Sequence, residues 1–143
     1  RPVSAMMVGA GDDLPKYRAQ VERLGLSAHV TFHDPMPARQ AFALARSIVV
    51  PSRAEAMPYI VLEALAAGKP MIATAVGGIP EIFEGRTELL IRPDPAEMAE
   101  RMARALADEA AFAGSMPPRG TLRQRFGADV MAREIEAIYH RHV

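Results

Sequence analysis

The sequence predicts an α/β fold in which helices flank a mostly parallel sheet. Short runs rich in Val and Ile alternate with amphipathic stretches, and glycine or proline separates most of them. The chain has 143 residues and half of them are apolar, which is enough for one compact domain with a single core.

The first part of the chain predicts two strand–helix pairs, at residues 5–8 and 14–24 and at residues 28–32 and 37–45. The glycine turn 9–11 ends the first apolar run, and Gly25 stops the first helix. His33-Asp34-Pro35 breaks the second strand, and Pro37 suits a first helical turn.

The middle of the chain continues this alternation. Residues 47–50 are small or apolar in succession, so we expect a strand buried on both faces. A helix is expected over residues 58–67, because Pro58 suits its first turn and Gly68 its C-terminal cap. A strand at 71–75 and a short helix at 79–83 follow.

The last part predicts a short strand at 89–91 and two helices. Asp94-Pro95-Ala96-Glu97 combines an N-cap acid, a first-turn proline and a capping-box glutamate, which opens a helix to about residue 107. Pro117-Pro118 marks a loop, and apolar residues return at helical spacing over 130–139.

Composition excludes several classes of function. The 17 basic and 17 acidic residues cancel without forming long blocks, so neither nucleic acid nor an anionic membrane surface is an expected partner. No apolar run reaches the ~20 residues of a membrane span. The absence of cysteine suits a reducing compartment, which makes a cytoplasmic protein the expectation. The histidines are not grouped with carboxylates at metal-ligand spacing, so no metal site is expected.

Ligands of open parallel sheets bind beyond the carboxyl ends of the strands. Segments that end strands in this way are residues 9–12, 33–36, 52–59 and 77–81. The amides at a helix N-terminus suit an anion, so the backbone of residues 57–60 is a candidate for a phosphate or for sugar hydroxyls. Glu55 lies just before this backbone and would point into the same cleft.

Glu55 and Glu63 stand out in an otherwise apolar stretch. Carboxylates accept hydrogen bonds from paired hydroxyls, so two of them could hold two polyol units. The alternative is a helix cap and a residue on a solvated face, which is the commoner role of helical glutamates. The helix around Glu63 is apolar nearly all round, however, so a buried Glu63 would need a partner.

Each of the other candidate site segments has two possible interpretations. Gly77-Gly78 is either a plain turn before Pro80 or a place where backbone approaches a ligand, with Glu81 reaching toward it. His33 is either a surface histidine or a ligand contact. The Gly9-Ala10-Gly11 turn resembles the start of a dinucleotide fingerprint, but Leu14 occupies the third glycine position, which argues against an NAD site.

Residues Pro51 to Phe83 resemble the signature region of family 4 glycosyltransferases, which are retaining enzymes of the GT-B fold. Their sequence is PSRAEAMPYIVLEALAAGKPMIATAVGGIPEIF. Three further segments resemble the same family, and they are VGAGDDL, HVTFHDPMP and TELLIRPDPAEMA. The resemblance implies a Rossmann-like sheet that forms the C-terminal half of a GT-B fold. Residues 1–143 would then be a partial nucleotide-sugar-binding domain, without the N-terminal acceptor domain and the first C-domain unit.

The resemblance also assigns roles to residues. Glu55 and Glu63 match the E-x7-E motif, with catalytic Glu55 expected near the donor sugar's hydroxyls and Glu63 on the ribose. His33 and Met36 would border the nucleobase. The remaining donor-binding residues would line the diphosphate, the hexose and the cleft wall, and they are Met57, Pro58, Tyr59, Ile60, Gly77, Gly78 and Glu81.

The implied function is transfer of a sugar from a nucleotide diphosphate sugar to a glycan or lipid-linked acceptor, with retention and without cofactor or metal. The family's E-G-F-G is Glu55-Ala56-Met57-Pro58 here, so two glycines are replaced where backbone would approach the ligand. The family's phosphate-clamping arginine and lysine and its acceptor domain belong to segments outside these residues, so the chain alone is expected to be inactive. The alternatives are a non-catalytic nucleotide-sugar-binding domain and a GT-B-type epimerase. For the parent protein, peripheral association with the inner face of the membrane is a further implication.

Overall fold

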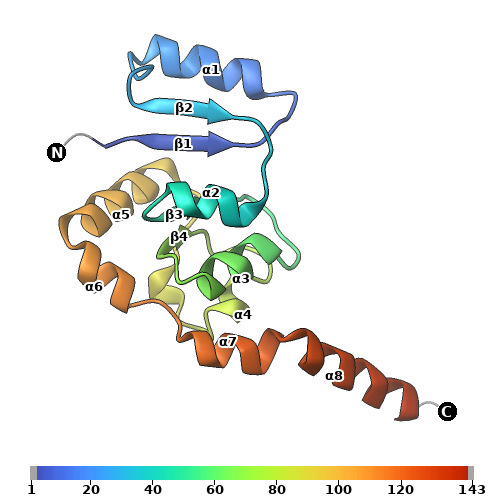
Figure 1. Ribbon diagram of the computed structural model, residues 1–143. Helices are drawn as coiled ribbons and strands as arrows, with labels where there is room; N and C mark the ends of the chain where they lie inside the picture. Colours follow the sequence, from blue (N-terminus) through green and yellow to red (C-terminus); the bar gives the residue numbers. More distant parts are fainter. Residues whose placement is uncertain (1–2, 142–143) are drawn as a thin grey trace. The chain divides into compact units, whose positions relative to one another are not determined.

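The computed structural model describes residues 3–141, and the chain divides into two compact units (Figure 1). The first unit ends at Ala45 and the second begins at Arg46. Each contains one pair of parallel strands, so the parallel α/β architecture is confirmed. The single continuous core expected from the composition is not observed, because the strands form two separate two-stranded sheets.

The first unit is a strand–helix–strand unit followed by a short helix. Strand β1 (Ala5–Val8) pairs with β2 (Val30–His33) in a register that places Ala5 opposite Val30, and helix α1 (Leu14–Arg23) connects them. Gly25 follows α1 with a φ of +68°, as its predicted capping role requires. Strand β2 begins later than expected and includes His33, and α2 (Ala38–Leu44) follows.

The second unit repeats the strand–helix–strand arrangement. Strand β3 (Ile48–Val50) pairs with β4 (Met71–Ala73), and α3 (Tyr59–Ala66) connects them. Pro58 is the N-cap of α3, one position before the first turn in which it was expected. The core of this unit lies between the strands and the helices α3 and α4 (Ile79–Ile82). Its fully buried side chains include Val61, Met71, Thr74, Ile79, Ile82 and Phe83.

Two predicted strand features are wrong. Strand β3 is not buried on both faces: Val50 is 6% exposed but Val49 is 38% exposed, because neighbouring residues of a strand face opposite sides. Residues 89–91 do not form a strand, since Thr87–Leu89 form a 3-10 helix (η1). Only Ile91 joins the sheet there, through a parallel bridge to Thr74.

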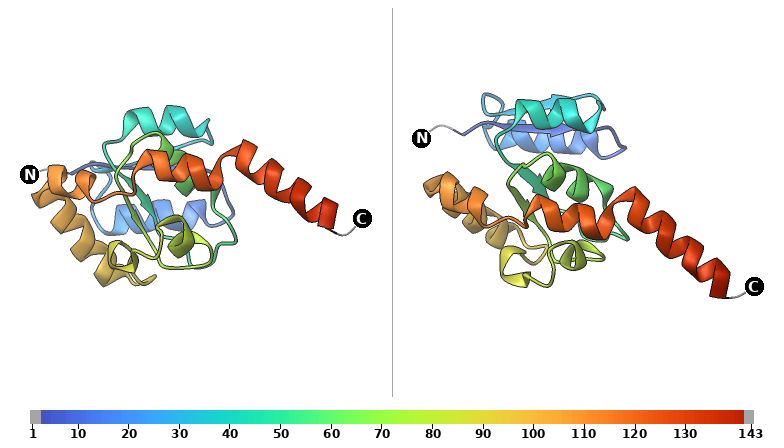
Figure 2. Two further views of the ribbon diagram at one scale, coloured as in Figure 1. Left: turned by 90° about the horizontal axis from the view of Figure 1, so that it is seen from below. Right: turned by 60° about the horizontal axis from the view of Figure 1, so that its bottom comes forward.

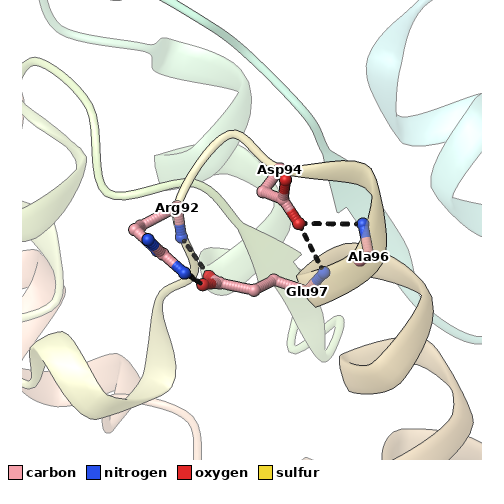
Figure 3. Close-up of polar contacts among 4 residues, drawn as sticks. All are labelled: Arg92, Asp94, Ala96 and Glu97. Atoms are coloured by element: carbon pink, nitrogen blue, oxygen red, sulfur yellow. Dashed lines mark hydrogen bonds and ion pairs between the residues drawn. The ribbon is translucent and has the colours of Figure 1, made fainter.

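Helix α5 (Pro95–Ala107) has the predicted N-cap, which Figure 3 shows. The Asp94 carboxylate accepts hydrogen bonds from the amides of Ala96 and Glu97 at 2.9 and 3.0 Å. Glu97 departs from the expected capping box because it turns to Arg92, accepting from its amide at 2.9 Å and pairing with its guanidinium. This partner lowers the pKa of Glu97 and raises that of Arg92.

The C-terminal part contains two helices that the sequence did not predict, α6 (Glu109–Gly114) and α7 (Arg119–Phe126). Helix α7 packs on α3, and its Leu122 is buried. Helix α8 (Ala128–Arg141) continues from α7 and extends away from α3 and α4 (Figures 1 and 2). None of the helices in residues 3–141 is both long and apolar enough to cross a membrane.

Candidate functional site

The loop between β3 and α3 carries the first candidate acid and is held by side-chain hydrogen bonds. The hydroxyl of Ser52 donates to Oε1 of Glu55 at 2.6 Å. The hydroxyl of Thr74, at the end of β4, donates to the carbonyl oxygen of Ser52 at 2.7 Å. Glu55 is half-buried and Thr74 is fully buried, so this part of the loop is anchored to the sheet.

The glycine turn after β4 lies against the same loop. A Cβ atom on Gly77 would lie 1.8 Å from the carbonyl oxygen of Glu55, and one on Gly78 would lie 2.6 Å from that of Ala56. The amide of Gly78 donates to the Ala56 carbonyl at 2.8 Å. The two glycines therefore allow backbone to approach backbone within the protein, which is a structural reason for them beyond a plain turn.

Helix α3 begins where this loop ends. Pro58 is buried at the N-cap and has no amide hydrogen. Tyr59 and Ile60 follow in the first turn, where α3 itself has no carbonyl oxygen that could accept from their amides. Met57, Tyr59 and Ile60 are 36%, 70% and 39% exposed. The start of α3 thus presents backbone donors and apolar side chains to its surroundings.

The second acid of the spaced pair is accessible. Glu63 lies in the middle of α3 with an exposed side chain, so it does not need the buried partner that the apolar sequence around it suggested. Its neighbours Val61, Ala64 and Leu65 form the buried face of the same helix. Glu81, in the short helix α4, is also exposed.

The structure brings some of the predicted residues together and leaves others apart. Glu55, Met57, Gly77 and Gly78 meet where the loop contacts the glycine turn. His33 and Met36 belong to the first unit, where His33 ends β2 and its carbonyl accepts from the Gly9 amide at 3.0 Å. His33 is exposed and Met36 is half-buried.

Ser52 and Thr74 are site residues that the sequence did not reveal as such. Both lie at strand ends, which is the signal that could have found them. No group of three or more His, Asp or Glu side chains is arranged for a metal ion in the part of the chain that the structure describes.

A hollow of about 310 Å³ lies away from this loop, along α5. Its walls include Arg101 and Arg104, which already have partners. Arg101 donates to the Glu88 carbonyl oxygen at 2.8 Å, and Arg104 pairs with Glu100 within α5. The hollow therefore presents satisfied surface groups, and the loop between β3 and α3 is the better candidate.

Comparisons with known proteins identify the family of this chain. A model of the family described as "Glycosyl transferases group 1" matches residues 1–108. The D-inositol 3-phosphate glycosyltransferase of Corynebacterium efficiens is 38% identical over 98 residues, which cover 65% of this chain and 23% of that protein. The corresponding protein of Arthrobacter sp. (strain FB24) is 34% identical over 128 residues, covering 86% of this chain and 30% of that protein.

Two solved structures share the fold. Anabaena Alr3699/HepE, solved in complex with UDP-glucose, superposes on 97% of this chain with a TM-score of 0.83 and 23% identity. The lipopolysaccharide outer core galactosyltransferase WaaB, in its apo form, superposes on 98% with a TM-score of 0.73 and 17% identity. This chain covers 41% of each.

The chain therefore spans less than a third of these two curated relatives and less than half of the two solved structures. The family model covers most of the chain, and the solved neighbours have the GT-B fold. The chain belongs to the group 1 glycosyl transferases.

Proposed function

We propose that this chain is the donor-binding part of a retaining glycosyltransferase. The parent protein would transfer a sugar from a nucleotide diphosphate sugar to a glycan or lipid-linked acceptor. The acceptor would be bound by a domain outside these residues, and association with the inner face of the membrane would be peripheral. The small share of each relative that the chain covers supports a role as one part of a larger enzyme.

One observation carries this proposal: the half-buried Glu55 is held on the loop that leads into α3, and the Gly77-Gly78 turn lies against this loop. The Glu55 carboxylate can accept hydrogen bonds from sugar hydroxyls, and the unpaired amides at the start of α3 can donate to a diphosphate. Glu63, exposed farther along α3, would accept from the ribose hydroxyls.

The other proposed donor contacts come from the resemblance to the family. The backbone of residues 57–60 would lie against the diphosphate and the hexose, with Gly77, Gly78 and Glu81 at the wall of the site. His33 and Met36 would border the nucleobase. The HepE structure, which contains UDP-glucose, supports a nucleotide sugar as the ligand class.

In the proposed reaction the bond between the anomeric carbon and the diphosphate oxygen breaks, and a bond from that carbon to an acceptor hydroxyl oxygen forms. The proton of this hydroxyl passes to the released diphosphate. The α3 amides would stabilise the negative charge that develops on the diphosphate. The reaction is proposed to need no metal, because basic residues of the parent outside this chain would share this charge. The isolated chain would bind the donor without transferring the sugar.

An amide-shift NMR titration of the chain with UDP, GDP, ADP and NAD tests the proposal. We expect weak binding of one nucleoside diphosphate, with shifts at residues 57–61 and 33–36. Glu63→Gln should weaken this binding about tenfold, the effect of removing a charge-assisted hydrogen bond of about 1.5 kcal/mol. Glu134→Gln, which removes an exposed carboxylate from α8, is the matched control and should bind as the wild type does.

Binding of NAD alone, with shifts centred on residues 9–13, would contradict the proposal in favour of a dinucleotide site. Equal effects of Glu63→Gln and Glu134→Gln would remove the proposed role of Glu63. The base that binds most tightly identifies the nucleotide of the donor.

A further inference from the structure

We infer that Ser52 and Thr74 are positioning residues that orient the Glu55 carboxylate before a ligand arrives. This inference rests on the proposed function, in which Glu55 accepts from hydroxyls of the donor sugar. Neither residue is assigned a contact with the donor, so both would act through Glu55.

The contact between Ser52 and Glu55 has the geometry of a strong hydrogen bond. The distance from Oγ of Ser52 to Oε1 of Glu55 is 2.6 Å, within the roughly 2.5 to 2.7 Å typical of a hydroxyl that donates to a carboxylate. Glu55 is half-buried, so water competes less for this bond than at an exposed site. A carboxylate can accept about four hydrogen bonds, so the bond orients Glu55 without saturating it.

Thr74 connects the Ser52 backbone to the sheet. Its side chain is fully buried, and its hydroxyl donates to the Ser52 carbonyl at 2.7 Å. The Thr74 amide donates to the Val50 carbonyl at 3.3 Å, and Thr74 forms the bridge to Ile91. Burying a hydroxyl costs free energy unless it forms a hydrogen bond, so the Thr74 hydroxyl is expected to keep its bond to the Ser52 carbonyl. This bond holds the Ser52 backbone next to the end of β4.

The backbone on the other side of Glu55 is restrained as well. The Gly78 amide donates to the Ala56 carbonyl at 2.8 Å, and Gly77 lies against the Glu55 carbonyl. The main chain of Glu55 is thus held by the glycine turn, and its side chain is held by Ser52. Of these restraints, only the Ser52 hydrogen bond sets the direction of the carboxylate.

Such ordering matters for affinity because a long side chain that is free before binding must be immobilised on binding. Immobilising one side chain costs about 0.5–1.5 kcal/mol, which corresponds to roughly 2- to 13-fold in affinity. The effect should appear only for ligands that contact Glu55. A donor sugar would lose affinity when the Ser52 hydroxyl is removed, whereas the nucleoside diphosphate alone would not.

The test compares Ser52→Ala and Ser52→Thr with the wild type by calorimetric titration. The probes are UDP-glucose and GDP-mannose, each beside its own nucleoside diphosphate. We expect Ser52→Ala to weaken binding of the preferred nucleotide sugar about fivefold while leaving the diphosphate unchanged. Ser52→Thr, which keeps a hydroxyl, should restore most of the loss. An equal change for both ligands, or no change, would overturn the inference.

A crystal structure of the Ser52→Ala chain decides the matter independently of ligand binding. The Glu55 carboxylate should leave its wild-type position while the backbone of residues 52–56 stays in place. If the carboxylate keeps its position, Ser52 does not orient it and the inference fails. If instead no nucleotide sugar binds the wild type but Glu55 moves in the variant, the proposed function fails and the positioning role stands.

Thr74 is tested by Thr74→Val, which keeps the shape of the side chain and removes its hydroxyl, beside Thr74→Ser, which keeps the hydroxyl. We expect Thr74→Val to show the same selective loss of nucleotide-sugar affinity, and Thr74→Ser to retain it. Should Thr74→Val fail to fold, the crystal structure of Thr74→Ser decides: Ser52 and Glu55 must keep their wild-type positions, and their displacement would overturn the role of the Thr74 hydroxyl.

Discussion

A Cβ atom on Gly77 would lie 1.8 Å from the carbonyl oxygen of Glu55, and Gly77 has a φ of +53°. Any other residue would meet the backbone of the acid-bearing loop in a conformation that L-residues rarely adopt. We expect Gly77→Ala to lower the free energy of unfolding by more than about 2 kcal/mol, since the left-handed backbone alone costs roughly 1–2 kcal/mol. Urea unfolding followed by circular dichroism measures this loss.

Gly85→Ala is the matched control for Gly77→Ala. Gly85 also has a positive φ, +73°, but a Cβ atom there would meet nothing within 4 Å. Gly85→Ala should therefore lower the free energy of unfolding by only the roughly 1–2 kcal/mol of backbone strain. Losses of the same size for both variants would show that the close approach between Gly77 and Glu55 does not hold in solution.

The elements around this contact were predictable, but the contact was not. Pro58 and Gly68 mark the ends of α3 through local backbone preferences, so sequence reasoning placed that helix within one residue at each end. The approach of Gly77 to Glu55 depends on the pairing of β3 with β4, which joins segments far apart in the chain. The hydrogen bond from Thr74 to the Ser52 carbonyl depends on the same pairing. The bond from Ser52 to Glu55 is local, but it depends on the conformation of an irregular loop that no residue pattern specifies.

The errors have local causes too. Helix α7 has one buried apolar residue, Leu122, among arginines, so it lacks the periodic pattern by which helices are recognised. Glu97 has the spacing of a capping box, but Arg92 offers it both an amide and a guanidinium. Spacing alone cannot decide between such competing partners.

The pair formed by Arg92 and Glu97 should make stability depend on pH in the acid range. Hydrogen bonding to Arg92 lowers the pKa of Glu97 below its ordinary value of 4.5, so folding favours the ionised carboxylate. This contribution is complete above pH 4.5 and is lost as the pH falls through the lower folded-state pKa. We expect Glu97→Gln to show a shallower decrease of the thermal midpoint below pH 4.5 than the wild type.

Glu134→Gln separates this specific effect from the general loss of a negative charge. Glu134 lies on α8 with an exposed side chain, and its variant should follow the wild-type acid dependence. Parallel curves for the wild type and Glu97→Gln would contradict the contribution of the pair.

Helices α7 and α8 should differ in what they contribute to stability. Leu122 on α7 is 5% exposed, so Leu122→Ala should lower the free energy of unfolding by about 2–4 kcal/mol through lost burial and a cavity. Ile135 on α8 is 46% exposed, and Ile135→Ala should change it by less than about 1 kcal/mol. Urea unfolding of both variants makes the comparison, and a larger loss for Ile135→Ala would show that α8 packs more tightly than α7.

The two acids of the spaced pair should affect different ligands if the proposed function is correct. Glu55 would accept from the donor sugar, so Glu55→Gln should weaken nucleotide-sugar binding about tenfold or more and leave the nucleoside diphosphate unaffected. Glu63 would accept from the ribose, which both ligands contain, so Glu63→Gln should weaken both by a similar factor. Calorimetric titration of each variant with UDP-glucose, GDP-mannose and the matching diphosphates gives two ratios of variant to wild-type affinity, one for the nucleotide sugar and one for the nucleoside diphosphate. An identical pattern for the two variants would mean that the glutamates do not bind separate sugars, even if a nucleotide binds.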